Sequence, residues 1–189
     1  MTMGAPLSIP RRAISVREYH KMIDAGVFRD DDQIELIEGE LIQMSPISGP
    51  HMQLVNILTR ILVQQVGEAG VVSPQNPIAL APDSEPEPDF VILRPECLHR
   101  TDVPTAQDVL LVVEVSHSSL AYDRDVKIPL YAKHGIPEVW IFETTSRSVS
   151  IYRDPVRSNY QRLLTPDRTE TISPALLPNV QIRLRDVWR

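Results

Sequence analysis

The sequence lacks several features that would assign it to a common class of protein. It contains a single cysteine, Cys97, and therefore neither an internal disulfide nor a Cys-x-x-Cys zinc motif. This absence favours a reduced cytoplasmic setting, in which Cys97 is a small buried apolar residue. No stretch approaches about eighteen uninterrupted apolar residues, so the sequence predicts no membrane-spanning helix.

Positive charge is also scarce. The chain of 189 residues has 19 lysines and arginines against 25 aspartates and glutamates, which gives a net charge of -6. Most non-specific nucleic-acid-binding proteins are basic, so any such role here depends on a local basic surface. Eight residues could form that surface beside a site: Arg94, Arg100, Arg124, Lys127, Lys133, Arg153, Arg157 and Arg162.

The frequent catalytic motifs are missing as well. The sequence has no GxSxG elbow, no P-loop and no GxGxxG turn, which argues against the hydrolases, nucleotide triphosphatases and dinucleotide enzymes that these motifs mark. Its five histidines show neither His-x-His nor HExxH spacing, which disfavours a histidine zinc site.

What the sequence does contain is a succession of short helical and strand-like segments. Residues 1–14 are interpreted as a flexible leader, and residues 15–189 as a single domain. Ser15 and Glu18 have the spacing of a capping box before a short helix that Gly26 ends. A β-hairpin is expected around the Glu38-Gly39 turn, between residues 33 and 46.

The rest of the pattern predicts an α/β (α+β) fold with a mixed β-sheet core. Helices are expected over residues 51–67 and 122–135, and strands over residues 71–80, 88–93, 108–116, 138–143 and 148–153. The order of the core elements is αβββαβ, with the N-terminal helix and hairpin added in front. Residues 109–113 are apolar at every position, which is typical of a central strand covered by helices on both faces.

A carboxylate in this central strand is the first functional clue. Glu114 follows five consecutive aliphatic residues and by alternation shares a face with Leu110, Val112 and Ser116. Burial of an unpaired charge is costly, so Glu114 must be protonated, paired, bound to a metal or placed at the mouth of a cleft. For this residue alone, a structural ion pair explains the pattern as well as a functional site does.

Two further residues strengthen the functional interpretation. Asp89 opens the preceding strand, and two carboxylates at neighbouring strand ends can hold one divalent cation through oxygen ligands. Lys127, in the following helix, lies at an i, i+4 separation from Asp123. That pair by itself is typical of a solvated surface salt bridge, whereas the two carboxylates favour a lysine that points back at the metal.

Taken together, these residues resemble the Uma-two family of restriction endonucleases, a branch of the PD-(D/E)XK nuclease superfamily. The resemblance spans nearly the whole chain. The segments that carry it are ELIEGE (35–40), His51 at the start of a helix, SPQNP (73–77), EPEPD (85–89), LLVVEVS (110–116), AYDRDVKIPLYAKHGIPEVWI (121–141) and the closing Val187-Trp188.

The resemblance implies a restriction-endonuclease-like core. Asp89 would belong to the PD element, and Glu114 would be the acidic residue of the (D/E)XK element. The lysine of the superfamily pattern would stand two residues later, where this chain has Ser116. The family is expected to supply that charge from the next helix, and Lys127 is the matching position. His117 and Glu143 are two smaller departures from the family pattern.

The function implied is that of an Mg²⁺-dependent endonuclease that hydrolyses DNA with a metal-activated water, and Mn²⁺ is a substitute ion. Asp89 and Glu114 would hold the metal, while Lys127 would orient the water or stabilise the developing charge. His51 would transfer a proton or contact phosphate, or else only cap its helix. Glu35 would be an outer metal ligand or a lysine partner, or else only pair with an arginine.

A second function is left open by the same residues. An inactive relative would retain the nuclease fold as an interaction or nucleic-acid-binding module, with its carboxylates in structural ion pairs. The intact set of Asp89, Glu114 and Lys127 favours the enzyme. A homodimer is also expected, because residues 136–140 and the strand over 148–153 would leave a sheet edge to pair, and two sites cut a duplex more simply than one.

Overall fold

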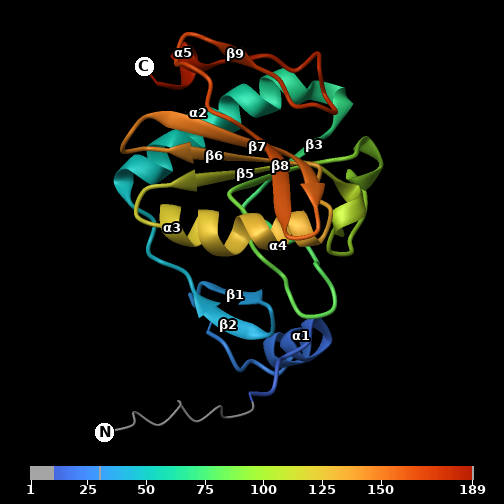
Figure 1. Ribbon diagram of the computed structural model, residues 1–189. Coiled ribbons are helices and arrows are strands. Elements are labelled where there is room, and N and C mark those ends of the chain that lie inside the picture. Colours follow the sequence, from blue (N-terminus) through green and yellow to red (C-terminus); the bar gives the residue numbers. More distant parts are fainter. Residues whose placement is uncertain (1–10, 30, 189) are drawn as a thin grey trace, which may run out of the picture.

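The computed structural model describes residues 11–29 and 31–188 of the chain (Figure 1). The first ten residues of the expected leader lie outside the described residues. The rest of the leader runs along the β-hairpin, where the Ile14 N–H donates a hydrogen bond to the Gly39 carbonyl at 3.0 Å. A side chain at Gly39 would collide here, because an added Cβ would come within 2.5 Å of the Ala13 Cβ.

A mixed sheet forms the centre of the molecule, as the sequence predicts, and it has six strands. The strands lie in the order β3, β4, β5, β6, β7, β8, and the β5–β6 pair is parallel while the other pairs are antiparallel. Every residue of β5 is buried, as expected for a central strand. The bounds are β3 (Val71–Pro74), β4 (Phe90–Leu93), β5 (Val109–Ser116), β6 (Glu138–Glu143), β7 (Ser148–Val156) and β8 (Asn159–Leu164).

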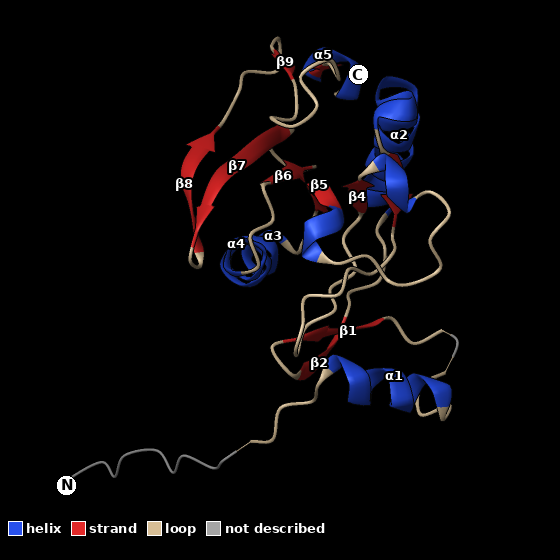
Figure 2. Cartoon of the chain, turned by 90° about the vertical axis from the view of Figure 1, so that its right-hand side faces the viewer, coloured by secondary structure: helices blue, strands red, loops and turns tan. Residues whose placement is uncertain are grey.

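Helices cover both faces of this sheet (Figure 2). One face packs against α2, which Ser48 caps and which presents Leu54, Leu58 and Leu62 to the sheet. The other face packs against a continuous helical segment whose middle turn, η4, is π-helical. The helices are α2 (Gly49–Val66), α3 (Leu120–Tyr122), η4 (Asp123–Lys127) and α4 (Ile128–Lys133).

The N-terminal elements form a separate unit at one end of the core (Figure 1). The capping box predicted for Ser15 and Glu18 is present. The hairpin turn has a positive φ of 80° at Gly39, a conformation that glycine adopts without strain. Backbone hydrogen bonds between Leu36 and Glu85 connect this unit to the segment that leads into β4. The elements are α1 (Val16–Asp24), β1 (Ile34–Ile37) and β2 (Glu40–Gln43).

The C-terminal elements pack over the α2 side of the core. Apolar side chains of this region, including Ile182, Leu184 and Val187, belong to the same cluster as the buried leucines of α2. Among the described residues, no helix combines the length and apolar character needed to cross a membrane. The remaining elements are η1 (Gly67–Ala69), η2 (Pro95–Cys97), η3 (Ala106–Asp108), β9 (Thr171–Ile172), β10 (Ile182–Arg183) and α5 (Leu184–Val187).

Two details of strands β3 and β5 differ from the prediction. The strand expected over residues 71–80 ends at Pro74, because the backbone turns at Gln75 with a φ of 50°. Leu110 does not share a face with Glu114 but packs in the core on the α2 side. The physical reason is a shift in the β4–β5 register next to Leu93, which interrupts the alternation of side chains.

The predicted sheet edge is also wrong. The strand over residues 148–153 lies inside the sheet as part of β7, because β8 pairs along its outer side. The sequence did not indicate β8, since all but one of its positions are exposed and it shows no apolar alternation. The outer strand on this side is therefore β8.

Candidate active site

The two predicted metal ligands meet where β4 begins and β5 ends. Asp89 directly precedes β4, and Glu114 lies near the end of β5. The antiparallel pairing of Phe90 with Val113 brings the two positions opposite each other. The Asp89 carboxylate is held there because its Oδ2 accepts a hydrogen bond from the Val115 N–H at 2.7 Å.

Lys127 reaches the same place from the helical segment that covers the sheet. Its Nζ lies 3.3 Å from Glu114 Oε1 and 3.2 Å from Glu35 Oε2. All three side chains are buried. The alternative in which Lys127 and Asp123 form a solvated surface pair is therefore wrong, because the lysine faces the sheet and its carboxylate partners lie in the interior.

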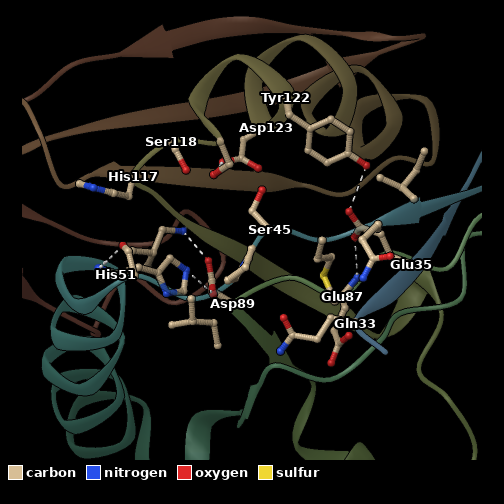
Figure 3. Close-up of a pocket in the computed structure, with 18 of the residues that line it drawn as sticks. Gln33, Glu35, Ser45, His51, Glu87, Asp89, His117, Ser118, Tyr122 and Asp123 are labelled. Carbon is tan, nitrogen blue, oxygen red and sulfur yellow. Dashed lines mark hydrogen bonds and ion pairs between the residues drawn. The ribbon is translucent and has the colours of Figure 1, made fainter. Parts of the chain in front are cut away.

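Two tyrosines of the same helical segment hold the carboxylates on either side of Lys127. The Tyr131 hydroxyl donates to Glu114 Oε1 at 2.6 Å. The Tyr122 hydroxyl donates to Glu35 Oε1 at 3.0 Å, as Figure 3 shows. Glu35 Oε2 also accepts the Glu87 backbone N–H at 3.2 Å. Both oxygens of Glu35 thus contact protein groups, and one of these groups is the Lys127 ammonium. Glu35 is therefore a partner of Lys127, and the alternative in which it pairs with an arginine is wrong.

His51 lies in the first turn of α2, beside Asp89. Its Nε2 is 3.0 Å from Asp89 Oδ1, whereas its Nδ1 is buried without a hydrogen-bond partner. The hydrogen bond with Asp89 raises the pKa of His51 above its ordinary value. The helix cap is the Ser48 hydroxyl, which accepts the His51 backbone N–H at 3.4 Å, so the imidazole does not serve as the cap.

Burial and neighbouring charges both act on the pKa values of these groups. Burial raises the pKa of Glu114, while the positive charge of Lys127 acts in the opposite direction. For Lys127, burial favours the neutral amine, but Glu114 and Glu35 outweigh burial and raise its pKa. Burial also raises the pKa of Asp123. Lys127 is therefore an ammonium ion, and it supplies a fixed positive charge among several carboxyl groups.

A cleft of about 730 Å³ lies beside these residues, between the N-terminal unit and the core (Figure 3). Glu35, Asp89 and Asp123 line it, whereas Glu114 and Lys127 do not. Its lining includes carboxylates and histidines from both sides: Asp32, Glu35, Glu87, Asp89, Asp123, His51 and His117. Among the described residues, no lysine or arginine lines it. The cleft wall is therefore acidic.

The predicted basic surface does not lie along this cleft. The basic residues proposed for it are dispersed and mostly paired with nearby carboxylates, which neutralise them locally. The pairs are Arg100 with Asp102 and Asp108, Arg124 with Asp125, Lys133 with Glu38, Arg153 with Glu138, and Arg162 with Asp154. The prediction of a basic surface beside the site is thus wrong for the cleft wall.

The sequence did not assign Asp123, Tyr131, Glu87 or Tyr122 to the site, although the structure brings them there. Asp123 and Tyr131 lie four residues before and four residues after Lys127, and this spacing could have indicated one helix face directed at the carboxylates. Glu87 lies two positions before Asp89, so strand alternation could have placed both on the cleft side. Tyr122 carries no signal in the sequence that marks it as the partner of a distant glutamate.

The donor set fits magnesium better than a transition metal. Mg²⁺ prefers hard oxygen ligands, retains several waters and is commonly held by one or two carboxylates, which Asp89 and Glu114 can supply. Within the described parts of the chain, no group of three or more His, Cys, Asp or Glu side chains gathers as a complete metal cage.

Comparisons with known proteins identify the family and the fold. A family model described as "Uma2: Putative restriction endonuclease" matches residues 16–185. No curated protein matches the sequence significantly. Among solved structures, the chain is similar to a "putative nuclease belonging to DUF820" from Anabaena variabilis, with a TM-score of 0.72 and 16% identity, covering 93% of this chain and 97% of the other. At that identity, the structural likeness establishes the fold.

Proposed function

Because the chain belongs to the Uma2 family of restriction endonucleases, we propose that it is an Mg²⁺-dependent endonuclease that hydrolyses phosphodiester bonds of DNA. Family and fold together indicate a nuclease. The dependence on a metal ion, the DNA substrate and the role of each residue in the candidate active site are parts of the proposal.

The contact between Lys127 and Glu114 supports the proposal most strongly. A PD-(D/E)XK nuclease needs a lysine beside the acidic residue of its central strand, and this chain has Ser116 where that lysine would stand. The Lys127 ammonium lies 3.3 Å from the Glu114 carboxylate. A well-packed apolar group of similar volume would stabilise the core as well as a buried ion pair does, which favours a chemical reason for the lysine.

Each residue has a separate task in the proposed reaction. Asp89 and Glu114 would hold Mg²⁺, and the bound ion would supply Lewis acidity toward a phosphate oxygen and the attacking water. Lys127 orients that water and stabilises the charge that develops on the phosphate. His51 exchanges a proton with water in the cleft, and Glu35 keeps Lys127 in place. The water oxygen bonds to phosphorus, the ester P–O bond breaks, and the leaving oxygen takes up a proton.

The acidic wall of the cleft supports the proposal that a metal ion must bind before nucleic acid does. Its wall carries carboxylates from both sides and, within the described lining, no lysine or arginine. A phosphodiester entering this cleft without a cation would meet like charge. A divalent ion between Asp89 and Glu114 would reverse this repulsion locally and give the phosphate a partner.

We further propose a cytoplasmic homodimer. Cys97 is buried and unpaired, as is typical of proteins in a reducing compartment. β8 is one of the two outer strands of the sheet and carries the exposed side chains of Leu163 and Leu164. Exposed apolar edge strands pair readily with a second strand. Two copies would present two sites to the two strands of a duplex.

The test of the proposed function combines metal binding with cleavage. Calorimetry measures Mg²⁺ and Mn²⁺ binding to wild type, Asp89→Ala and Glu114→Ala, and cleavage of supercoiled plasmid is assayed on the same samples. We expect wild type to bind metal and cut, and both variants to lose both properties. Glu68→Ala, which removes an exposed carboxylate outside the site, should behave as wild type.

The opposite result would assign a different role to the carboxylates. If wild type binds no divalent ion at millimolar concentration, and Asp89→Ala and Glu114→Ala are merely less stable, the nuclease proposal is overturned. The protein would then be an inactive nuclease-fold module for interaction or nucleic-acid binding.

A further inference from the structure

The residue at the strand position of the missing lysine makes a specific contact of its own. Ser116 is 0% exposed, and its hydroxyl donates a hydrogen bond to Asp123 Oδ2 at 2.5 Å. The Ser119 hydroxyl donates to the same oxygen at 2.8 Å. The Asp123 carboxylate, itself 4% exposed, is thus held between the end of β5 and the start of the helical segment. We call Ser116, Ser119 and Asp123 the serine clamp.

The serine clamp is attached to the π-helical turn that carries Lys127. Asp123 begins η4 and Lys127 ends it. The Ile128 N–H donates to the Asp123 carbonyl, which is the i→i+5 hydrogen bond of a π turn. Such turns are rare and are frequently found at functional sites. This hydrogen bond therefore connects Asp123 to Ile128, the residue that directly follows Lys127.

The π turn directs three side chains toward β5. In an α-helix, eight residues rotate about 80° beyond two full turns, so Asp123 and Tyr131 would point in different directions. A wider turn rotates the chain less per residue and offsets this divergence. Asp123 contacts Ser116, while Lys127 and Tyr131 both contact Glu114, two residues earlier on the same face of the strand.

We propose that the serine clamp positions Lys127 in the nuclease site. It fixes the π turn against β5 and so determines where the Lys127 ammonium stands between Glu35 and Glu114. The inference rests on the proposed function and deepens it, because Ser116 occupies the strand position of the absent lysine and orients the lysine that replaces it. Ser116 is a positioning residue, since it is fully buried and acts only through Asp123.

Lysine NMR tests the placement of Lys127 without an activity assay. The chain has three lysines, and Lys21 and Lys133 are exposed whereas Lys127 is buried. Protein labelled with ¹³C at the lysine ε-carbon gives one methylene signal for each, and the Lys127 signal is identified by its loss in Lys127→Met. We expect Ser116→Ala to shift or split the Lys127 signal and to leave the other two unchanged.

A matched control separates the clamp from the general effect of removing a buried hydroxyl. Ser84 is also 0% exposed, and its hydroxyl accepts the Glu38 N–H at 2.8 Å. Ser84→Ala should therefore leave the Lys127 signal as in wild type. Ser119→Ala removes the other hydroxyl of the clamp at a half-buried position, and it provides the test if Ser116→Ala does not fold.

Plasmid cleavage by the same variants supplies the functional readout. Ser116→Ala should lower kcat about tenfold, as expected when a group that acts on the reacting atoms is slightly misplaced. The KM for plasmid and the Kd for Mg²⁺ should stay within about twofold of wild type, because neither substrate nor metal touches Ser116. A purely structural serine would instead change the unfolding midpoint alone.

The possible outcomes separate this inference from the proposed function. If Ser116→Ala and Ser119→Ala fold and leave the Lys127 signal unchanged, the serine clamp does not position Lys127. If the signal moves but kcat stays as in wild type, the position of Lys127 does not matter for cleavage, and the inference is also overturned. If the wild-type protein cuts no nucleic acid, the proposed nuclease function is overturned. If the Lys127 signal still moves in the clamp variants, the conclusion that the serine clamp positions Lys127 stands.

Discussion

Lys127 Nζ lies 3.2 Å from Glu35 Oε2, and this contact connects the N-terminal hairpin to the helical segment that covers the sheet. The two side chains are 6% and 1% exposed. On the other side of the ammonium, Glu114 provides the link to the central strand. A single lysine thus holds together the three parts of the chain that form the candidate active site.

Removal of Glu35 should be strongly destabilising. Glu35→Ala leaves the buried Lys127 ammonium without one of its two carboxylates, and breaking a buried pair in this way costs about 3–5 kcal/mol. The free energy of unfolding from urea titration measures the effect. Lys133→Ala is the control, because its pair with Glu38 is exposed and is worth about 1 kcal/mol or less. Equal losses in the two variants would contradict a stabilising role for the buried pair.

Removal of the Lys127 charge should lower the cleavage rate without lowering the affinity for Mg²⁺. Lys127→Met keeps the length and apolar stem of the side chain but removes its charge. We expect cleavage to fall about 100-fold or more, as when a preorganised electrostatic group is lost. Calorimetry should show Mg²⁺ affinity equal to or higher than in wild type, because a positive charge next to Glu114 has gone. A loss of metal binding would show that Lys127 acts through the metal ligands and not on the substrate.

Nucleic-acid binding should depend on a divalent ion. Because the described cleft lining is acidic, fluorescence anisotropy with a labelled duplex should detect no binding in excess EDTA. Ca²⁺, which also takes oxygen ligands, should restore binding without efficient hydrolysis. Glu114→Ala should bind weakly under all of these conditions. Tight binding in EDTA would place the nucleic-acid surface outside this cleft.

The dimer should depend on the outer strand β8. Leu163 is 56% exposed on this strand, and a lysine there opposes edge-to-edge pairing. Light scattering after size-exclusion chromatography should give a dimer mass for wild type and a monomer mass for Leu163→Lys. Leu98→Lys changes a leucine that is 62% exposed elsewhere and should remain dimeric. A monomeric wild type at high concentration would exclude the dimer.

His134 should make the protein less stable in acid. Burial, together with the charge of Lys133, lowers the pKa of His134, and its Nε2 is buried without a partner. The unfolded chain therefore takes up a proton at this position more readily than the folded protein does. The contribution to stability is complete above the ordinary histidine pKa and is lost as the pH falls through the lowered one.

Thermal melts between about pH 7.5 and pH 5 measure this effect. His134→Gln should show a smaller decline in the unfolding temperature over that range than wild type. His99→Gln, which changes an exposed histidine, should keep the full decline. The same decline in all three proteins would rule out His134 as its source.

The local elements could be predicted because their signals lie within a few residues of one another. The Ser15 capping box and the buried stripe of α2 were read correctly from spacing alone, as was the aliphatic strand β5. The exposed strand β8 and the register shift near Leu110 could not be predicted, since pairing with a neighbouring strand, and not a local pattern, produces them.

For the site, the residue types that are available follow from the sequence: two carboxylates near the ends of neighbouring strands, a lysine on the next helix and no lysine at position 116. The folded chain brings Lys127 between Glu35 and Glu114, and it brings the Ser116 hydroxyl within hydrogen-bond distance of Asp123. Burial explains these contacts. These groups are taken out of water by the meeting of distant segments, and each must then find its partner among whichever polar groups the packing brings within reach.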